Sequence, residues 1–147
     1  MNVYGPCQGE LRDEFVVGLY NLEIDPDQKW MLMGAFNFIR SIDNRNLPGG
    51  DINDMFIFNE IIGHLGLLEL PLKRRKFTWS NMQDMPLLEQ LDWVFTSASW
   101  IKIYPMTQVT PLAKTVSDHV PCLLTISTSN PKAHIFRFEI FWVHQDG

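Results

Sequence analysis

The segment Trp30–Phe36 is an almost unbroken run of apolar residues, and the polar Asn37 follows it directly. A short run of this kind is typical of a central β-strand that is covered on both faces. The chain has 147 residues, 46% of them hydrophobic, which is enough for the core of one domain and too little for two of ordinary size. We therefore expect one packed domain, or a piece of one, that contains this strand.

Hydrophobic spacing predicts two helices, one before and one after this strand. Over residues 11–22, apolar residues recur three and four positions apart, which places on one helical face Leu11, Phe15, Leu19 and Leu22. Over residues 54–65, the same spacing holds for Met55, Phe58, Ile62 and Leu65. Asp51 or Asn53 can cap this second helix, and Gly66 suits the left-handed position after it. Residues 38–50, rich in Asn, Pro and Gly, are predicted to form an irregular loop.

Further short runs have the composition of strands: 67–70, 77–80, 91–95, 101–110 and 121–127. Together with the helices they predict a mixed α/β domain. A polar stretch at residues 128–131 then separates this body from an aromatic tail. We therefore divide the chain into a domain over residues 1–128 and a linker or terminal strand over residues 129–147.

Charge and cysteine content exclude several kinds of site. The formal net charge of −5 provides no global positive field for nucleic acid, so any phosphate contact must be local. The basic run Lys73–Lys76 is either such a patch or a solvated loop. Cys7 and Cys122 lack metal-ligand spacing and favour neither a zinc site nor a disulfide framework, which points to a reducing intracellular compartment. Every apolar run is shorter than a membrane span, so no membrane partner is expected.

Polar residues at predicted strand ends are the candidates for chemistry: Tyr4, Asn37, Asp92, Asp118 and His119. Phosphodiester hydrolysis needs a metal-binding carboxylate, a base that activates water and donors for the developing phosphoryl charge, and this set offers those groups. Each residue also has a plain structural interpretation. Asn37 and Asp118 could form turns, Asp92 could face solvent at a strand edge, and Tyr4 could belong to the core.

Four short motifs occur in the order expected of one family: Asn2-Val3-Tyr4-Gly5-Pro6, Gly34-Ala35-Phe36-Asn37, Leu91-Asp92-Trp93-Val94-Phe95 and Ser117-Asp118-His119. They resemble the NVYGP, GDFN, LDRVF and SDH motifs of endonuclease/exonuclease/phosphatase domains. Residues 77–81 resemble the FTWSN strand of plant LINE-type retrotransposon endonucleases. The tail residues 136–139 resemble the segment before the reverse transcriptase region of such polyproteins. The resemblance spans nearly the whole chain.

This resemblance implies the C-terminal portion of a two-sheet β-sandwich flanked by helices, which is the four-layer fold of the family. It implies that Tyr4 and Asn37 position the scissile phosphate, that Asp118 belongs to the metal and acid/base network, and that His119 contacts the phosphate or the attacking water. Asp92 would orient and polarise His119. Thr78 and Ser117 would give supporting phosphate contacts. The implied cofactor is Mg²⁺, the implied partner is DNA, and the implied location is nuclear; the oligomeric state stays open.

The chain also departs from the family pattern. Ala35 replaces the aspartate of GDFN, and a methyl group cannot accept a proton from water, so a rate loss of about two to four orders of magnitude is expected. Trp93 replaces the arginine of the LDR motif, and Arg74 stands where a glycine usually precedes the FTWSN strand. The family's metal-ligand glutamate lies upstream of NVYGP, where this chain starts. Asp118 alone is therefore expected to make a weak magnesium site.

Three functions are compatible with these features. The first is a fragment of a metal-dependent DNA endonuclease of retrotransposon type that is catalytically impaired. The second is a non-catalytic nucleic-acid-binding or interaction remnant. The third is a phosphatase-like protein that acts on small phosphorylated molecules, because one fold can host several substrates.

Overall fold

A computed structural model of the chain describes residues 1–113 and 116–128. Its centre is a four-stranded sheet with the order β1-β2-β6-β3, formed by β1 (Asn2–Tyr4), β2 (Met31–Ala35), β6 (Asp92–Thr96) and β3 (Leu68–Glu69). Strand β1 is parallel to β2, whereas β6 is antiparallel to both β2 and β3. The predicted strand at residues 30–36 is thus confirmed as β2, inside the sheet.

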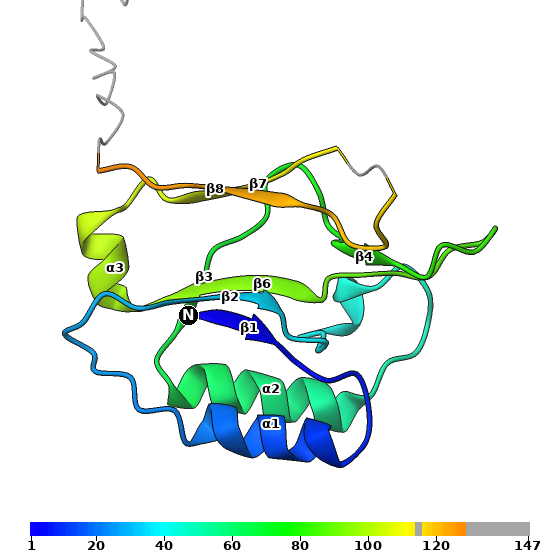
Figure 1. Cartoon of the computed structure of the whole chain (residues 1–147), viewed down its shortest axis with the longest axis horizontal. Coiled ribbons are helices and arrows are strands. Elements are labelled where there is room, and N and C mark those ends of the chain that lie inside the picture. Colours follow the sequence, from blue (N-terminus) through cyan, green and yellow to red (C-terminus); the bar gives the residue numbers. More distant parts are fainter. Residues whose placement is uncertain (114–115, 129–147) are drawn as a thin grey trace, which may run out of the picture.

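Both faces of this sheet are covered (Figure 1). Helices α1 (Glu10–Tyr20) and α2 (Ile52–His64) pack on one face, and a ribbon of β7 (Gln108–Pro111) and β8 (Cys122–Thr125) crosses the other. The α/β prediction is confirmed. The described residues form helix, sheet and ribbon layers, and the four-layer sandwich stays a prediction. No helix in the described part of the chain is both long and apolar enough to span a bilayer.

The main core lies between the helices and the sheet. Phe58 of α2 is 1% exposed and lies at the centre of an aromatic cluster. Its ring centroid lies 5.3–6.2 Å from four other rings, those of Phe36, Phe38, Trp93 and Phe95. Offset and edge-on contacts of this kind add to the stabilisation that burial provides.

The two predicted helices are confirmed, and they run parallel to each other. Near their first turns, the Arg12 guanidinium lies 2.5 Å from the Asp54 carboxylate. At their last turns, the rings of Tyr20 and His64 stack with centroids 4.4 Å apart. Of the two predicted caps, Asp51 is the one that caps α2, by accepting the backbone N–H groups of residues 53 and 54. Gly66 has the predicted left-handed conformation.

Strands β1 and β2 approach each other at Gly34. This residue has a φ of +136°, and a Cβ atom built there would overlap the carbonyl oxygen of Val3. Only glycine combines this conformation with so close an approach. The glycine of the motif therefore lets β1 pair with β2, and that pairing brings Tyr4 next to Ala35.

The predicted strand over residues 101–110 is wrong in its first half. Residues 98–103 form helix α3 (Ala98–Ile103), and strand β7 starts only at Gln108. The Ser97 side chain accepts the backbone N–H of Trp100, which caps the helix and overrides the strand preference of Ile101 and Ile103.

A hairpin of β4 (Trp79–Ser80) and β5 (Leu88–Glu89) stands beside the main sheet. Strand β4 was predicted within residues 77–80, but β5 was not predicted. The irregular segment 38–50 is confirmed, apart from a short 3-10 turn, η1 (Ile42–Asn44). The predicted linker or terminal strand at residues 129–147 lies outside the described residues.

Candidate functional site

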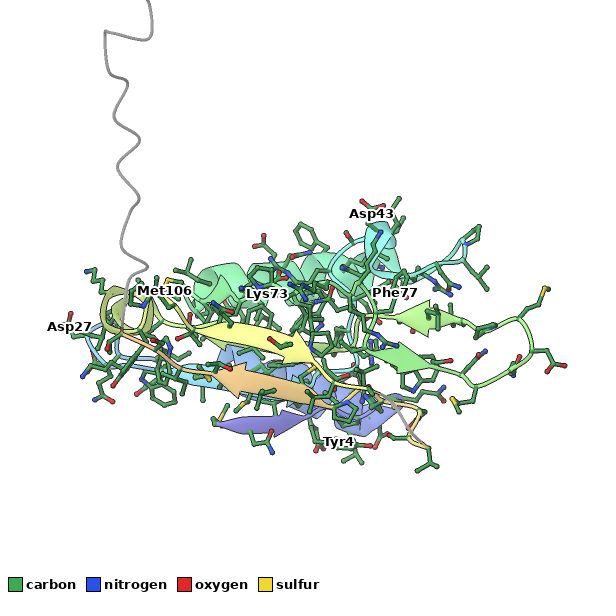
Figure 2. All side chains as sticks on the ribbon, turned by 90° about the horizontal axis from the view of Figure 1, so that it is seen from above. Tyr4, Asp27, Asp43, Lys73, Phe77 and Met106 are labelled. Atoms are coloured by element: carbon green, nitrogen blue, oxygen red, sulfur yellow. The ribbon has the colours of Figure 1, made fainter. Side chains whose placement is uncertain are left out.

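Most of the predicted site residues meet in one cleft of about 530 Å³ at the end of the sheet where β1 and β2 finish. Tyr4, Asn37, Asp118 and His119 all line it, although they come from three separate segments. In Figure 2, Tyr4 lies near the middle of the molecule, away from Asp27 and Met106 at one end. The fold thus brings together residues that are more than 100 positions apart in the sequence.

Asp92 lies behind the cleft and holds His119. Its Oδ2 atom is 2.8 Å from the His119 Nδ1 atom, and both side chains are partly exposed. An ionised carboxylate can only accept hydrogen bonds, so the Nδ1 atom donates and the Nε2 atom of a neutral imidazole keeps its lone pair for the cleft. The structure therefore makes the pairing that the resemblance implied, while the catalytic roles stay predictions.

Asp118 accepts a hydrogen bond from the indole of Trp79, with 3.0 Å between Nε1 and Oδ2. This bond stabilises the charged carboxylate and is the main reason why the pKa of Asp118 lies below its ordinary value. The backbone of the same segment pairs with β4, since Ser80 N–H donates to the Asp118 carbonyl at 3.0 Å. Strand β4 thus places the SDH motif at the edge of the cleft.

Tyr4 and Asn37 complete the other wall. The Tyr4 side chain is 80% exposed, which leaves its ring accessible from solvent. Asn37 adopts a left-handed backbone conformation with a φ of +58°, which asparagine tolerates better than most residues. Its side-chain amide donates to the carbonyl of Gly5, so the Asn37 side chain is fixed against the turn after β1.

The two predicted supporting phosphate contacts are placed differently. Thr78 is fully buried, and its hydroxyl accepts the backbone N–H groups of Leu91 and Asp92, both at 3.0 Å. It therefore anchors the start of β6 and does not line the cleft, contrary to the predicted phosphate contact. Ser117 is exposed, and its hydroxyl accepts the His119 backbone N–H at 3.1 Å, which shapes the turn of the SDH motif.

Arg12 also lines the cleft, and the sequence patterns did not indicate it. Its guanidinium donates to the carbonyls of Cys7 at 3.2 Å and Asn37 at 3.1 Å, and it lies 3.7 Å from the centre of the Phe38 ring. One cation thus joins the turn after β1, the end of β2 and helix α2. Its position in the charged stretch at the start of a helix gave no signal of this role.

The acidic side chains in the cleft are largely engaged. Asp54 pairs with Arg12, Glu89 lies 3.5 Å from Arg45, and Asp51 caps α2. Within residues 1–113 and 116–128, no three His, Cys, Asp or Glu side chains gather as metal ligands. The described residues therefore provide no preassembled set of three such ligands for the magnesium ion that the resemblance implies.

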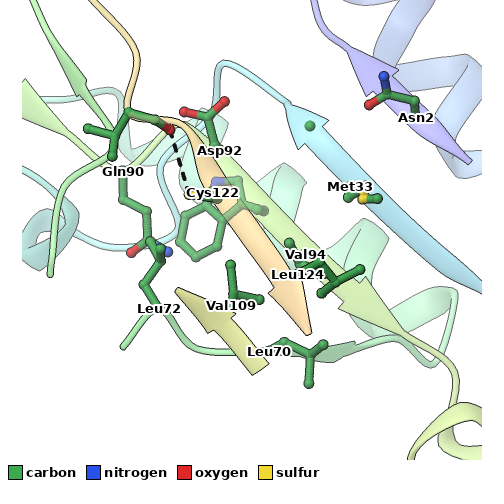
Figure 3. Close-up of a pocket in the computed structure, with 13 residues that line it drawn as sticks. Asn2, Met33, Leu70, Leu72, Gln90, Asp92, Val94, Val109, Cys122 and Leu124 are labelled. Carbon is green, nitrogen blue, oxygen red and sulfur yellow. Dashed lines mark hydrogen bonds between the residues drawn. The ribbon is translucent and has the colours of Figure 1, made fainter. Parts of the chain in front are cut away.

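A second cavity, of about 180 Å³, lies between the sheet and the β7–β8 ribbon (Figure 3). Met33 and Val94 line it from the sheet, and Val109 and Leu124 line it from the ribbon. Asp92 and Cys122 stand at its polar end, where the thiol donates to the Val120 carbonyl at 3.6 Å. Burial, and then the charge of Asp92, raise the pKa of Cys122. Asp92 therefore borders the apolar cavity while its carboxylate reaches His119.

The structure also accommodates the departures from the family motifs. Ala35 lies in register with Tyr4 on β1 and Asp92 on β6, so its methyl group lies beside their side chains on the same face of the sheet.

Trp93 is 2% exposed, and its indole donates to the Phe38 carbonyl at 2.8 Å. Arg74 has a φ of +60°, the left-handed conformation that glycine favours. The run Lys73–Lys76 is exposed and forms a loop.

No family model matches the chain. Over 156 residues, the chain is 27% identical to the protein described as "Transposon TX1 uncharacterized 149 kDa protein" from Xenopus laevis. The match covers 100% of this chain and 12% of that relative, so the chain spans a small part of the protein it matches. The chain is thus similar to one segment of a transposon protein.

Proposed function

We propose that the chain is a nuclease-type module of retrotransposon origin whose cleft holds a phosphate group of DNA and whose hydrolytic activity is impaired. The observation that carries this proposal is the convergence of Tyr4, Asn37, Asp118 and His119 on one cleft, with Asp92 bonded to His119 behind it. These residues belong to the motifs of the resemblance, and unrelated surface residues would not be expected to meet at one place.

The chemistry of these groups suits a phosphoryl group. The His119 Nε2 atom can accept a proton or, when the ring is charged, donate to a phosphate oxygen. The Tyr4 hydroxyl can donate to a second oxygen, whereas the Arg12 guanidinium in the same cleft is paired with Asp54 at 2.5 Å and adds little net positive charge. Position 35, where the family motif has an aspartate, holds an alanine and offers no base for the attacking water. We therefore propose binding with little hydrolysis.

The affinity is expected to be weak. Asp118 and Asp51 add negative charge to the same cleft, and the net charge of the chain is −5. Contacts between a few cationic groups and phosphates release counterions, so binding should fall as salt rises. The exposed loop at residues 73–76 carries four lysine and arginine residues that could extend such a contact along a DNA backbone.

An NMR titration with a short DNA duplex at low salt tests the binding. We expect the imidazole signals of His119 to shift, and those of His64, which stacks on Tyr20 at the far end of the helices, to stay in place. The His119→Ala variant should lose the binding, whereas His64→Ala should keep it. Equal shifts at both histidines, or no shift at either, would contradict the proposed cleft.

A nicking assay with supercoiled DNA and Mg²⁺ tests the impairment. The unmodified chain should leave the DNA intact over times at which an active nuclease of this type relaxes it. Nicking that disappears in the His119→Ala variant would show that Ala35 does not abolish activity, and the impairment would then be rejected while the binding proposal stands.

A further inference from the structure

We infer that the outer groove between α1 and α2 docks a partner helix with an apolar stripe and basic residues beside that stripe. This inference is independent of the proposed nuclease-type cleft. The groove has a volume of about 340 Å³, and its lining is almost entirely apolar. Val16, Val17 and Tyr20 line it from α1, and Phe56, Ile57 and Ile61 line it from α2.

The residues that line this groove are unusually accessible for apolar side chains. Phe56 is 65% exposed, Val17 57% and Tyr20 50%. A single exposed apolar residue is normal, but a contiguous group in a groove marks an interaction surface. The two helices already bury their other apolar face against the sheet, through Leu19 and Phe58. The exposed apolar side chains in the groove therefore form a second apolar face, which is not part of the core between the helices and the sheet.

The charges around the groove define the chemistry of the partner. Arg12 and Asp54 neutralise each other. The other carboxylate residues on the two helices are Glu10, Asp13, Glu14 and Glu60, and neither helix contains a lysine. Glu60 itself lines the groove. A partner with lysine or arginine beside its apolar stripe would complement Glu60 and the other carboxylates of the two helices, whereas a second copy of the chain would place carboxylates against carboxylates.

The geometry favours a helix as the partner. The groove lies between two parallel helices and is lined over residues 16–21 and 56–61, so at about 1.5 Å per residue its length is roughly 9 Å, or between one and two helical turns. A docked helix can place side chains from positions i, i+3 and i+4 in a groove of that length. An extended segment would gain no backbone pairing here, because helices offer no free strand edge.

Binding of a labelled 18-residue peptide of leucine and lysine, patterned as an amphipathic helix, tests the inference. Fluorescence anisotropy with the full chain should show saturable binding. The Phe56→Ser and Val17→Ser variants should each weaken it about tenfold or more. The matched control is Leu123→Ser, because Leu123 is 51% exposed on β8, across the sheet from the helices. This control should bind like the wild type, and circular dichroism should show that all three variants fold.

The contribution of charge is tested separately. A leucine and glutamate peptide with the same pattern should not bind, and the Glu14→Gln/Glu60→Gln double variant should bind the lysine peptide more weakly, with less dependence on salt. Equal affinity of the wild type and Phe56→Ser, or equal binding of both peptides, would overturn the inference. A concentration-dependent dimer that Val17→Ser disperses in sedimentation would assign the groove to self-association and would overturn it as well.

Discussion

Ala35 on β2 lies directly opposite Asp92 on β6 in the antiparallel ladder of the central sheet. Directly opposed residues in such a ladder point to the same face, so the methyl group is the neighbour of the carboxylate that holds His119. The position at which the family motif has an aspartate is therefore next to an existing negative charge. This relationship determines how much stability the protein would lose if the aspartate were restored at position 35.

The Ala35→Asp variant should be less stable than the wild type at neutral pH, by about 1–3 kcal/mol. Ala35 is 8% exposed, and a carboxylate there would be desolvated and would face Asp92. Both effects raise the pKa of the new group in the folded state, so the penalty is greatest at high pH and shrinks as the pH falls and the group is protonated. Urea denaturation across pH 4–8 measures this, with the uncharged Ala35→Asn variant as control. A pH-independent penalty would contradict the electrostatic explanation.

Removal of the Asp92 carboxylate should change the tautomer of His119. In the wild type, the carboxylate favours the Nδ1–H form of the neutral ring, and Asp92→Ala removes that preference. The stability loss should be small, about 1 kcal/mol or less, because both side chains are partly exposed. Imidazole nitrogen shifts in long-range NMR spectra report the tautomer directly. Unchanged shifts in the variant would show that the bond does not set the tautomer.

Replacement of Trp79 by phenylalanine should raise the pKa of Asp118 toward its ordinary value. The indole bond favours the ionised carboxylate, so it stabilises the fold above the unfolded-state pKa of Asp118, and this stabilisation is lost as the pH falls through the lower folded-state pKa. The difference is therefore confined to acidic solution. A carboxyl NMR titration of Asp118 in both proteins measures it, and identical midpoints would contradict the assigned cause.

Two glycine substitutions should have opposite effects on stability. Gly34→Ala should cost more than about 3 kcal/mol, because a Cβ atom would overlap the Val3 carbonyl and because the φ of +136° disfavours a side chain. Gly18→Ala should stabilise the protein by about 0.5–1 kcal/mol, since Gly18 lies in α1 with no atoms within 4 Å of its added Cβ. Thermal denaturation of the pair checks both signs. A well-folded Gly34→Ala protein would show that β1 does not need this close approach.

Arg74→Gly should stabilise the protein by up to about 1 kcal/mol. The left-handed conformation costs a non-glycine residue about 1–2 kcal/mol, and the entropy of glycine in the unfolded chain offsets part of the gain. Lys73→Gly, one position earlier and without a positive φ, should be neutral or destabilising. Denaturation midpoints measured side by side separate the two. Equal effects would show that the conformation of Arg74 carries no strain.

The sequence predicted the helices and strands whose apolar residues follow one clear pattern. The apolar run before Asn37 predicted β2, and the helical spacing with Asp51 and Gly66 predicted α2 and both of its ends. The short helix at residues 98–103 was missed because Trp100, Ile101 and Ile103 favour strands, while one hydroxyl cap decides the outcome. Strand β5 has two residues and forms only because β4 lies beside it, so local patterns could not indicate it.

The candidate site was predictable only in part. Motif order pointed to Tyr4, Asn37 and the Asp92–His119 pair, and the fold brings them together. Thr78 was assigned to phosphate because a hydroxyl in a motif is ambiguous, and only its burial shows that it holds β6. Arg12 was missed because the Asn37 carbonyl and the Asp54 carboxylate, which it contacts, come close to it only in the folded chain and leave no local pattern in the sequence.

The parallel course of α1 and α2 has an electrostatic consequence for the cleft. Each helix behaves as if it carried about half a positive elementary charge at its first turn. The contact between Arg12 and Asp54 places both first turns at the same edge, where Gln8 and Asp51 line the cleft. An antiparallel pair would cancel these fields, but here they add. An incoming anion therefore meets a peptide-backbone potential that partly offsets the carboxylates, and no side-chain substitution can remove it.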